Sequence, residues 1–383
     1  MSTTAGLSDP HLATPSGKPR ARAVGVPFEG TPGGWNAITD VPGVEVGYAT
    51  VIRGEDVRTG VTAIHPRGRS NPGDPCAAGF FSQNGNGEMT GTAWIEESGT
   101  ASLPVTITNT HAVGIAHEAT IRWAVERFPE LGEAWLLPVA AETWDGYLND
   151  INGGQVTREV VIEALDAGRP GAIELGSVGG GTGMNCYGFK GGNGSASRLV
   201  DFGSRTFTVG VFLQCNFGSR HELRIAGAPV GQVFADDDPL GEWSPAADGA
   251  GSVIGVVITD APLLPQQCKA MARRVPLGLA RTGTTGSHFS GDLFLALSTA
   301  NAGAFATGFP PAGERDDEIS SIRFIPWGRI DPLYAAVVAA VEEAVVDALV
   351  ANDEMTGRSG HRTPALPRER LAEVVRGDQA ARS

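Results

Sequence analysis

The stretch from Ala247 to Pro262, ADGAGSVIGVVITDAP, changes character at the Gly251-Ser252 bond. The residues before that bond are small, and Val253 to Ile258 form an apolar, β-branched run that predicts a strand buried on both faces. A serine hydroxyl is a weak nucleophile until a base removes its proton. The chain has no G-x-S-x-G motif of the kind that accompanies a histidine-activated serine. Another base would therefore have to activate Ser252.

Ser252 could use its own α-amine as that base if the bond before it were cut. A free α-amine has a pKa of about 7.7–8.0, so much of it is uncharged near neutrality, and it lies beside its own hydroxyl. The hydroxyl can make the cut by attacking the Gly251 carbonyl and forming an ester that water hydrolyses. Glycine favours this attack because it has no Cβ and tolerates strained backbone angles. An ordinary Gly-Ser turn before a strand is the alternative interpretation.

The sequence shows no motif known to bind a nucleotide cofactor or a metal. The stretch from Gly176 to Gly192, GSVGGGTGMNCYGFKGG, contains neither G-x-x-x-x-G-K-[ST] nor G-x-G-x-x-G. It predicts a glycine-lined wall that approaches another strand or a small substrate closely. The seven histidines form no metal-binding pattern. We therefore expect no cofactor and no metal, and the four widely spaced cysteines are expected to be buried, reduced thiols.

Composition and charge narrow the class of protein. The 383 residues are 41% hydrophobic and 19% charged, and no window approaches the roughly 18 apolar residues of a membrane span. A net charge of −14 would repel phosphate backbones and anionic membrane surfaces, so nucleic acids and membranes are not expected partners. The N-terminal stretch lacks the apolar core of a secretion signal, which favours the cytoplasm. Residues 1–33 are expected to form a flexible tail.

Strand and helix patterns alternate along the rest of the chain. Helices are predicted from Thr157 to Ala167, from Leu263 to Val275, and from Leu333 to Val350 after an Asp331 N-cap. The last is apolar on almost every side, so it should be buried between layers. Residues 34–383 contain no linker and predict one α/β domain. Strands are expected at Ala134–Ala141, Thr206–Gln214, Val253–Thr259 and Leu293–Thr299.

Seven segments of the chain, in order, carry a resemblance to a known family: ITDVPGVEVG (Ile38–Gly47), TNTHAVG (Thr108–Gly114), AETWDGYLNDING (Ala141–Gly153), GSVGGGTGMNCYGFKGG (Gly176–Gly192), QCNFG (Gln214–Gly218), DGAGSVI (Asp248–Ile254) and HFSGDLFLALSTAN (His288–Asn301). They resemble the DmpA family of self-processing serine aminopeptidases, peptidase family S58. The resemblance runs from about residue 20 to the C-terminal helix. It implies a four-layer αββα sandwich, similar in layering to N-terminal nucleophile hydrolases but different in connectivity. It also implies cleavage into pieces 1–251 and 252–383 that stay together, and assembly as a homotetramer.

The resemblance assigns roles to the residues around the nucleophile. Ser252 would be the nucleophile and the new N-terminus. Ser290 and Asp292 match the family's Ser-Gly-acid element, which holds the nucleophile's hydroxyl and amine. Alternate residues entering a strand point to one side, and a carboxylate with a hydroxyl can orient an amine and stabilise its protonated form. Asn216 matches the side-chain amide that donates to the oxyanion. Without the resemblance, Ser290 to Asp292 and Asn216 would be interpreted as turn residues.

The same resemblance assigns substrate contacts to the segment after Ala141. Glu142 matches the carboxylate that binds the substrate's free amino group and so places the first amide bond at the nucleophile. Trp144 stands where the family often has a tyrosine whose hydroxyl lies near the oxyanion. An indole can donate a hydrogen bond but cannot accept one, so the second oxyanion donor and the acyl pocket are expected to differ. Tyr147 could substitute, although alternation would place it on the opposite side.

The sequence thus predicts an aminopeptidase or amidase acting on short peptides, amino-acid amides or esters. Linear amide hydrolases of the nylon-oligomer type share the architecture but process before threonine, so Ser252 disfavours them. N-acyltransferases of related fold also use a threonine. An uncut binding protein with a glycine-lined cleft is the non-catalytic alternative. Sequence does not distinguish α-L, D or β-amino residues, because that choice depends on about one methylene of pocket shape.

Overall fold

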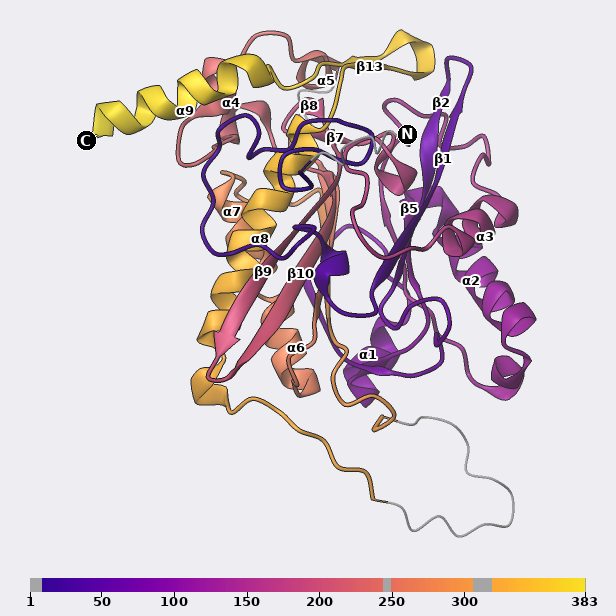
Figure 1. Cartoon of the computed structure of the whole chain (residues 1–383). Coiled ribbons are helices and arrows are strands. Elements are labelled where there is room, and N and C mark those ends of the chain that lie inside the picture. Colours follow the sequence, from indigo (N-terminus) through magenta and orange to yellow (C-terminus); the bar gives the residue numbers. More distant parts are fainter. Residues whose placement is uncertain (1–8, 244–248, 306–318, 383) are drawn as a thin grey trace, which may run out of the picture.

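Two β-sheets lie face to face, with helices on the outer side of each (Figure 1). The computed structural model describes residues 9–243, 249–305 and 319–382. The larger sheet has the order β4 (Thr100–Ala101), β3 (Cys76–Gly85), β12 (Ser290–Ser298), β11 (Gly251–Thr259), β10 (Arg205–Asn216) and β9 (Gly192–Phe202). The smaller sheet has the order β1 (Glu45–Arg53), β2 (Val57–His65), β5 (Val105–Asn109) and β6 (Ala140–Thr143).

Three apolar clusters hold the layers together. One fills the space between the sheets and includes Ile254 and Leu295 from the larger sheet and Ile107 from the smaller. Another packs α8 (Asp331–Val350) and its neighbours against the larger sheet, and the third packs α2 (Val113–Arg127) and α3 (Arg158–Asp166) against the smaller. This arrangement confirms the predicted four-layer αββα sandwich. The other helices are α1 (Thr92–Ser98), α4 (Val230–Val233), α5 (Pro239–Trp243), α6 (Pro265–Ala272), α7 (Val275–Arg281) and α9 (Arg368–Arg382).

Several predicted elements are confirmed and two are corrected. The predicted strands Thr206–Gln214 and Val253–Thr259 lie inside β10 and β11, and Leu293–Thr299 matches β12 except at Thr299. Helix α8 is buried as expected. The predicted strand Ala134–Ala141 is wrong before Ala140, because Pro138 lacks an N–H for pairing and Trp135 is 80% exposed. The predicted helix from Leu263 to Val275 is shorter than expected, because α6 covers only Pro265–Ala272 and a separate helix, α7, begins at Val275; Pro276 cannot continue a helix from α6. Short hairpins complete the fold: β7 (Asn185–Cys186) with β8 (Phe189–Lys190), and β13 (Met355–Thr356) with β14 (Arg362–Thr363).

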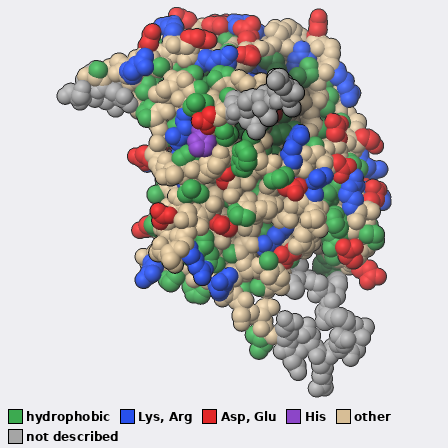
Figure 2. Space-filling view, viewed as in Figure 1, with side chains coloured by type: hydrophobic (Ala, Val, Ile, Leu, Met, Phe, Trp, Pro, Cys, Tyr) green, Lys and Arg blue, Asp and Glu red, His purple; other side chains and the backbone are tan. Residues whose placement is uncertain are grey.

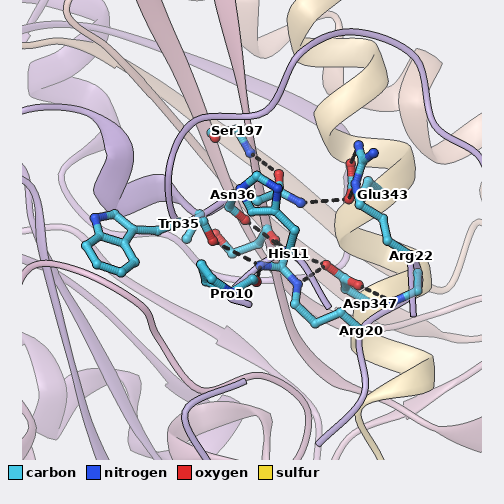
Figure 3. Close-up of polar contacts among 12 residues, drawn as sticks. Pro10, His11, Arg20, Arg22, Trp35, Asn36, Ser197, Glu343 and Asp347 are labelled. Carbon is cyan, nitrogen blue, oxygen red and sulfur yellow. Dashed lines mark hydrogen bonds and ion pairs between the residues drawn. The ribbon is translucent and has the colours of Figure 1, made fainter. Parts of the chain in front are cut away.

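The predicted flexible tail is wrong for residues 9–33, while residues 1–8 lie outside the described residues. Arg20 is 4% exposed, and its guanidinium binds Asp347 of α8 at 2.5 Å (Figure 3). Arg22 and Arg198 both pair with Glu343 one turn earlier on the same helix. The N-terminal segment is therefore fastened across α8 by buried ion pairs.

We expect Arg20→Ala to destabilise the protein by about 3–5 kcal/mol, because it leaves the buried Asp347 carboxylate without its partner. Chemical denaturation followed by circular dichroism measures the change. Arg281→Ala is the matched control, since Arg281 pairs on the surface with Glu29 and Glu342 and should cost about 1 kcal/mol or less. Equal losses from the two variants would contradict the structural role of the Arg20 pair.

Charged side chains of both signs are interspersed over the face seen in Figure 2. Within the described residues, no helix is both long enough and apolar enough to cross a membrane. The same residues contain no cluster of His, Cys, Asp or Glu suited to a metal ion. All four cysteines are buried and unpaired, as predicted.

Candidate active site

Ser252 lies at the N-terminal end of β11, between two neighbouring strands. It pairs with Asn216 of β10 on one side and with Gly291 of β12 on the other. Its side chain is on the same face of β11 as Ile254 and Val256, which pack between the two sheets. The order β12, β11, β10 therefore brings the predicted nucleophile and oxyanion residue together, although Asn216 and Ser252 are far apart in sequence.

Gly251 allows the close approach of β10 to the bond before Ser252. A Cβ at this position would lie 1.9 Å from the Asn216 carbonyl oxygen, which is a backbone clash. Gly291 is constrained in the same way, because its Cβ would lie 2.4 Å from the Asn86 carbonyl oxygen. Packing therefore requires glycine both before Ser252 in the chain and opposite it on β12. Because Gly251 has no side chain, nothing on that residue shields its carbonyl carbon.

Ser290 and Asp292 form a hydrogen-bonded pair beside the backbone of β11. Ser290 Oγ donates to Asp292 Oδ1 at 2.6 Å, and Asn84 Nδ2 donates to the other carboxylate oxygen at 3.1 Å. Val253 lies opposite Asp292 in the parallel pairing of β11 with β12. Burial raises the pKa of Asp292, although these hydrogen bonds oppose the shift. The pair is thus one residue along from the amine that cleavage at Ser252 would free.

Alternation along β12 separates this pair from the Ser252 hydroxyl. Leu293 and Leu295 face the space between the sheets with Ser252, whereas Phe294 faces the helices behind the larger sheet. Ser290 and Asp292 share the parity of Phe294, so they lie behind the strand. The side chains of Ser290 and Asp292 therefore lie on the opposite face of the larger sheet from the Ser252 side chain, beside the β11 backbone.

Asn216 ties the nucleophile's strand to the segment after β6. Its Nδ2 donates to the Trp144 carbonyl at 2.9 Å, and its Oδ1 accepts from the Asn185 N–H at 2.9 Å. The Trp144 N–H in turn donates to Ser252 Oγ at 3.3 Å. A side-chain amide has two N–H hydrogens, so Asn216 can hold Trp144 and still donate to a charge that forms beside Ser252. The backbone N–H of Trp144 is thus a further hydrogen-bond donor beside Ser252.

Glu142 faces the same space from the smaller sheet. Its side chain is buried, and it accepts hydrogen bonds from the Glu88 N–H at 2.9 Å and from the Thr110 hydroxyl. Burial raises the pKa of Glu142, and the bond from Thr110 opposes this shift. A buried carboxylate with two donors on it still has acceptor capacity for a substrate ammonium. Thr110 was not predicted, although it lies inside the segment Thr108–Gly114 that carries part of the resemblance.

The structure separates the two aromatic residues that the sequence placed here. The ring of Trp144 is 37% exposed and lines the cavity in front of Ser252. Tyr147 is 2% exposed, and its hydroxyl donates to the Arg362 carbonyl at 3.3 Å. Tyr147 is therefore not a substitute oxyanion donor, as its alternation with Trp144 suggested. The Trp144 main-chain N–H, and not the Tyr147 hydroxyl, is the donor that lies beside Ser252 Oγ.

The cavity in front of Ser252 has a volume of about 710 Å³, which is within the range of small-molecule sites. It opens between the ends of the two sheets and is lined mostly by apolar groups. The glycine-rich wall predicted from the sequence contributes Gly188. The lining residues are Asn86, Gly87, Glu88, Thr110, Glu142, Trp144, Gly188, Gly218, Arg220, Asp238, Leu240, Gly241, Trp243, Gly249, Ala250, Gly251, Ser252 and Phe289.

Comparison with known proteins decides the family. The family model of peptidase family S58 matches residues 36–363 of this chain. The chain belongs to peptidase family S58. The β-peptidyl aminopeptidase BapA of Sphingosinicella microcystinivorans is 45% identical to this chain over 376 residues, which cover 94% of this chain and 92% of that protein.

Solved structures agree with the S58 assignment. The L-aminopeptidase D-Ala-esterase/amidase from Ochrobactrum anthropi, described as a prototype of the serine aminopeptidases and a new variant among the Ntn hydrolase fold, matches with a TM-score of 0.87. It is 46% identical, over 94% of this chain and 99% of that one. A β-aminopeptidase from Burkholderia sp. matches with a TM-score of 0.84 and 42% identity, over 94% and 98% of the two chains. This S58 chain is thus a hydrolase of the aminopeptidase class, and the nylon-oligomer and acyltransferase alternatives receive no support.

Asp145 is a further buried group of this S58 site that the sequence did not single out. It is fully buried directly after Trp144, and its Oδ1 accepts a hydrogen bond from Asn149 Nδ2 at 3.0 Å. Its backbone carbonyl accepts from the N–H groups of Leu148 and Asn149. Burial raises the pKa of Asp145 to about 7. The carboxyl fastens the turn that presents Trp144 to Ser252, and an Asp-Gly pair, which often marks a turn, was the available signal.

Proposed function

We propose that Ser252 is an N-terminal nucleophile that the chain creates by cutting its own Gly251-Ser252 bond. Ser252 Oγ attacks the Gly251 carbonyl carbon, the peptide nitrogen leaves as the α-amine, and an ester joins Gly251 to Ser252. Water then hydrolyses that ester, which releases a Gly251 carboxylate and regenerates the hydroxyl. The products are pieces 1–251 and 252–383, and the second begins with Ser252.

The freed amine then serves as the base for substrate hydrolysis. It takes the proton of Ser252 Oγ as the oxygen attacks the substrate carbonyl, and Asp292 with Ser290 holds the resulting ammonium. Asn216 and the Trp144 N–H donate to the oxyanion. The ammonium then protonates the leaving nitrogen, and water hydrolyses the acyl-serine ester. Glu142 binds the substrate's own ammonium, so the bond that is cut follows the first residue.

The observation that carries this proposal is the position of Ser252 Oγ. This oxygen accepts a hydrogen bond from the Trp144 N–H at 3.3 Å. Asn216 approaches it from the larger sheet, and Glu142 of the smaller sheet lines the same cavity. Intact-mass spectrometry of the purified, active protein under denaturing conditions tests it. Two species, one ending at Gly251 and one beginning at Ser252, are expected; an active enzyme that stays a single 383-residue chain would reject the mechanism.

The substrates proposed are short peptides, amino-acid amides and esters with a free amino group. The cavity of about 710 Å³ is suited to a few residues and not to a folded protein. The relatives' names include both β-peptidyl and L-amino or D-Ala substrates, so the first residue is the variable to measure. A panel of p-nitroanilides with α-L, D and β-amino acyl groups, compared by kcat/KM, identifies the preferred class.

We also propose that the cut protomers work as a cytoplasmic homotetramer. The resemblance supports the tetramer, and four buried, unpaired cysteines fit a reducing compartment. Light scattering coupled to size-exclusion chromatography measures the assembly. A monomer of about 39.7 kDa would contradict it.

The pH dependence should report the Ser252 amine. We expect kcat/KM to rise with pH as an α-amine with a reference pKa of about 7.7–8.0 loses its proton. Asp292→Asn removes the negative charge that favours the ammonium, so this rise should move about one pH unit lower, with a loss of about tenfold or more in kcat/KM at its optimum. Steady-state rates from pH 5 to 10 measure it. An unchanged profile with reduced soluble yield would show that Asp292 is only structural.

A further inference from the structure

The strand order gives the cavity two chemically different ends. Glu142 lies over the β12 side of Ser252, because a Cβ on Gly87 would be 3.2 Å from Glu142 Oε1 and 3.1 Å from the Gly291 Cα. Trp144 lies over the β10 side, because its carbonyl accepts from Asn216. Ser252 is between them on β11. A substrate anchored by its ammonium at Glu142 therefore extends past Ser252 toward the Trp144 end.

Aromatic and apolar side chains form the wall at that end. The rings of Trp144 and Trp243 are stacked, with centroids 6.5 Å apart and planes 20° apart. They are 37% and 52% exposed, and both line the cavity together with Leu240. Large exposed aromatic faces beside a nucleophile indicate a contact surface that a ligand completes.

A rigid platform supports this wall from behind. Tyr147 meets the Trp243 ring edge-on at 5.4 Å and stacks on His361 at 4.6 Å. The ring nitrogen Nδ1 of His361 lies 2.8 Å from the Tyr147 carbonyl oxygen, within hydrogen-bond distance. Helix α5, which ends at Trp243, packs beside β14, and Figure 1 shows α5 next to the hairpin of β13. The wall is therefore held in place before a substrate arrives, which lowers the cost of ordering it on binding.

We propose that Trp144 and Trp243 form a leaving-side subsite that binds the apolar, preferentially aromatic, side chain of the residue released by hydrolysis. This inference rests on the proposed function, because the direction of the substrate follows from Glu142 and Ser252. The subsite selects the second residue of the substrate, whereas the space between Glu142 and Ser252 selects the first. The chain is thus an aminopeptidase whose preferred substrates carry a Phe or Trp after the cleaved bond.

Two substrate series test the subsite. One joins the best first residue of the p-nitroanilide panel to Gly, Leu, Phe or Trp, and the other varies the first residue before a constant Phe. For the unmodified enzyme we expect kcat/KM to be about tenfold higher for Phe than for Gly in the first series. Trp243→Ala should reduce this Phe-to-Gly ratio to about one to two, and Trp243→Leu should give an intermediate ratio. Liquid chromatography of the released amino acid measures both.

The control variant is Trp327→Ala, which removes another half-exposed tryptophan away from the cavity and should leave the ratio unchanged. A flat first series with normal turnover would overturn the subsite and leave the proposed function standing. A Trp243→Ala effect confined to the first residue would also overturn it, because the wall would then belong to the acyl side. Absence of turnover for every peptide, amide and ester would reject the proposed function and the subsite with it.

Discussion

Replacing Ser252 by alanine is expected to leave a single uncut chain with no measurable aminopeptidase activity. The hydroxyl is required twice, first to attack the Gly251 carbonyl and then to attack the substrate, and no other group can replace it at that position. The loss should exceed about 10⁴-fold in kcat, in line with the removal of a nucleophile from other hydrolases. Denaturing electrophoresis, intact mass and turnover of the best p-nitroanilide measure both effects.

Two comparisons separate this loss from misfolding. Ser252→Ala removes a small, buried hydroxyl, so its thermal unfolding should stay close to that of the unmodified protein. Ser252→Cys restores a nucleophile of similar size, and we expect it to be cut at the same bond, because a thiolate is intrinsically more nucleophilic than a hydroxyl. Normal turnover by Ser252→Ala would refute Ser252 as the nucleophile.

Glu142→Gln is expected to lower kcat/KM by about 10²–10³-fold for substrates with a free amino group. The substitution keeps the size of the side chain but removes the buried negative charge that pairs with the substrate ammonium, and breaking such a pair costs about 2–5 kcal/mol. Self-cleavage should continue, because the Gly251-Ser252 bond has no free ammonium nearby. The fall should be mainly an increase in KM. Steady-state kinetics and intact mass on the same preparation measure the two effects.

The matched control for Glu142 is Glu88→Gln. Glu88 also lines the cavity and its N–H donates to Glu142, but its side chain is exposed. Removing an exposed charge should change kcat/KM by a few-fold at most. Equal losses for the two variants would indicate a general field effect, and a normal KM for Glu142→Gln would show that the ammonium binds elsewhere. Burial raises the pKa of Glu142, so the carboxylate takes up a proton as the pH falls. We therefore expect KM to increase at lower pH.

Local patterns in the sequence determined the elements that carry the site. The apolar runs predicted β11 and β12 because a strand buried on both faces needs them, and the Ala-rich and Val-rich stretch predicted α8 for a similar reason. The Gly-Ser boundary suggested the self-cleavage chemistry without any knowledge of the fold. These inferences depend on residues that are close in sequence, so the chain alone was sufficient for them.

Only the tertiary structure decided how these elements meet. Ser252 lies between Asn216 and Gly291 because β11 pairs with β10 and β12, and strand order depends on contacts between distant residues. The Trp144 N–H could not be recognised as a donor, because every residue except proline has one and only the fold aims it at Ser252. Arg20 belongs to the core for the same reason: its partner Asp347 is 327 residues away, and no local pattern reports such a distant charge.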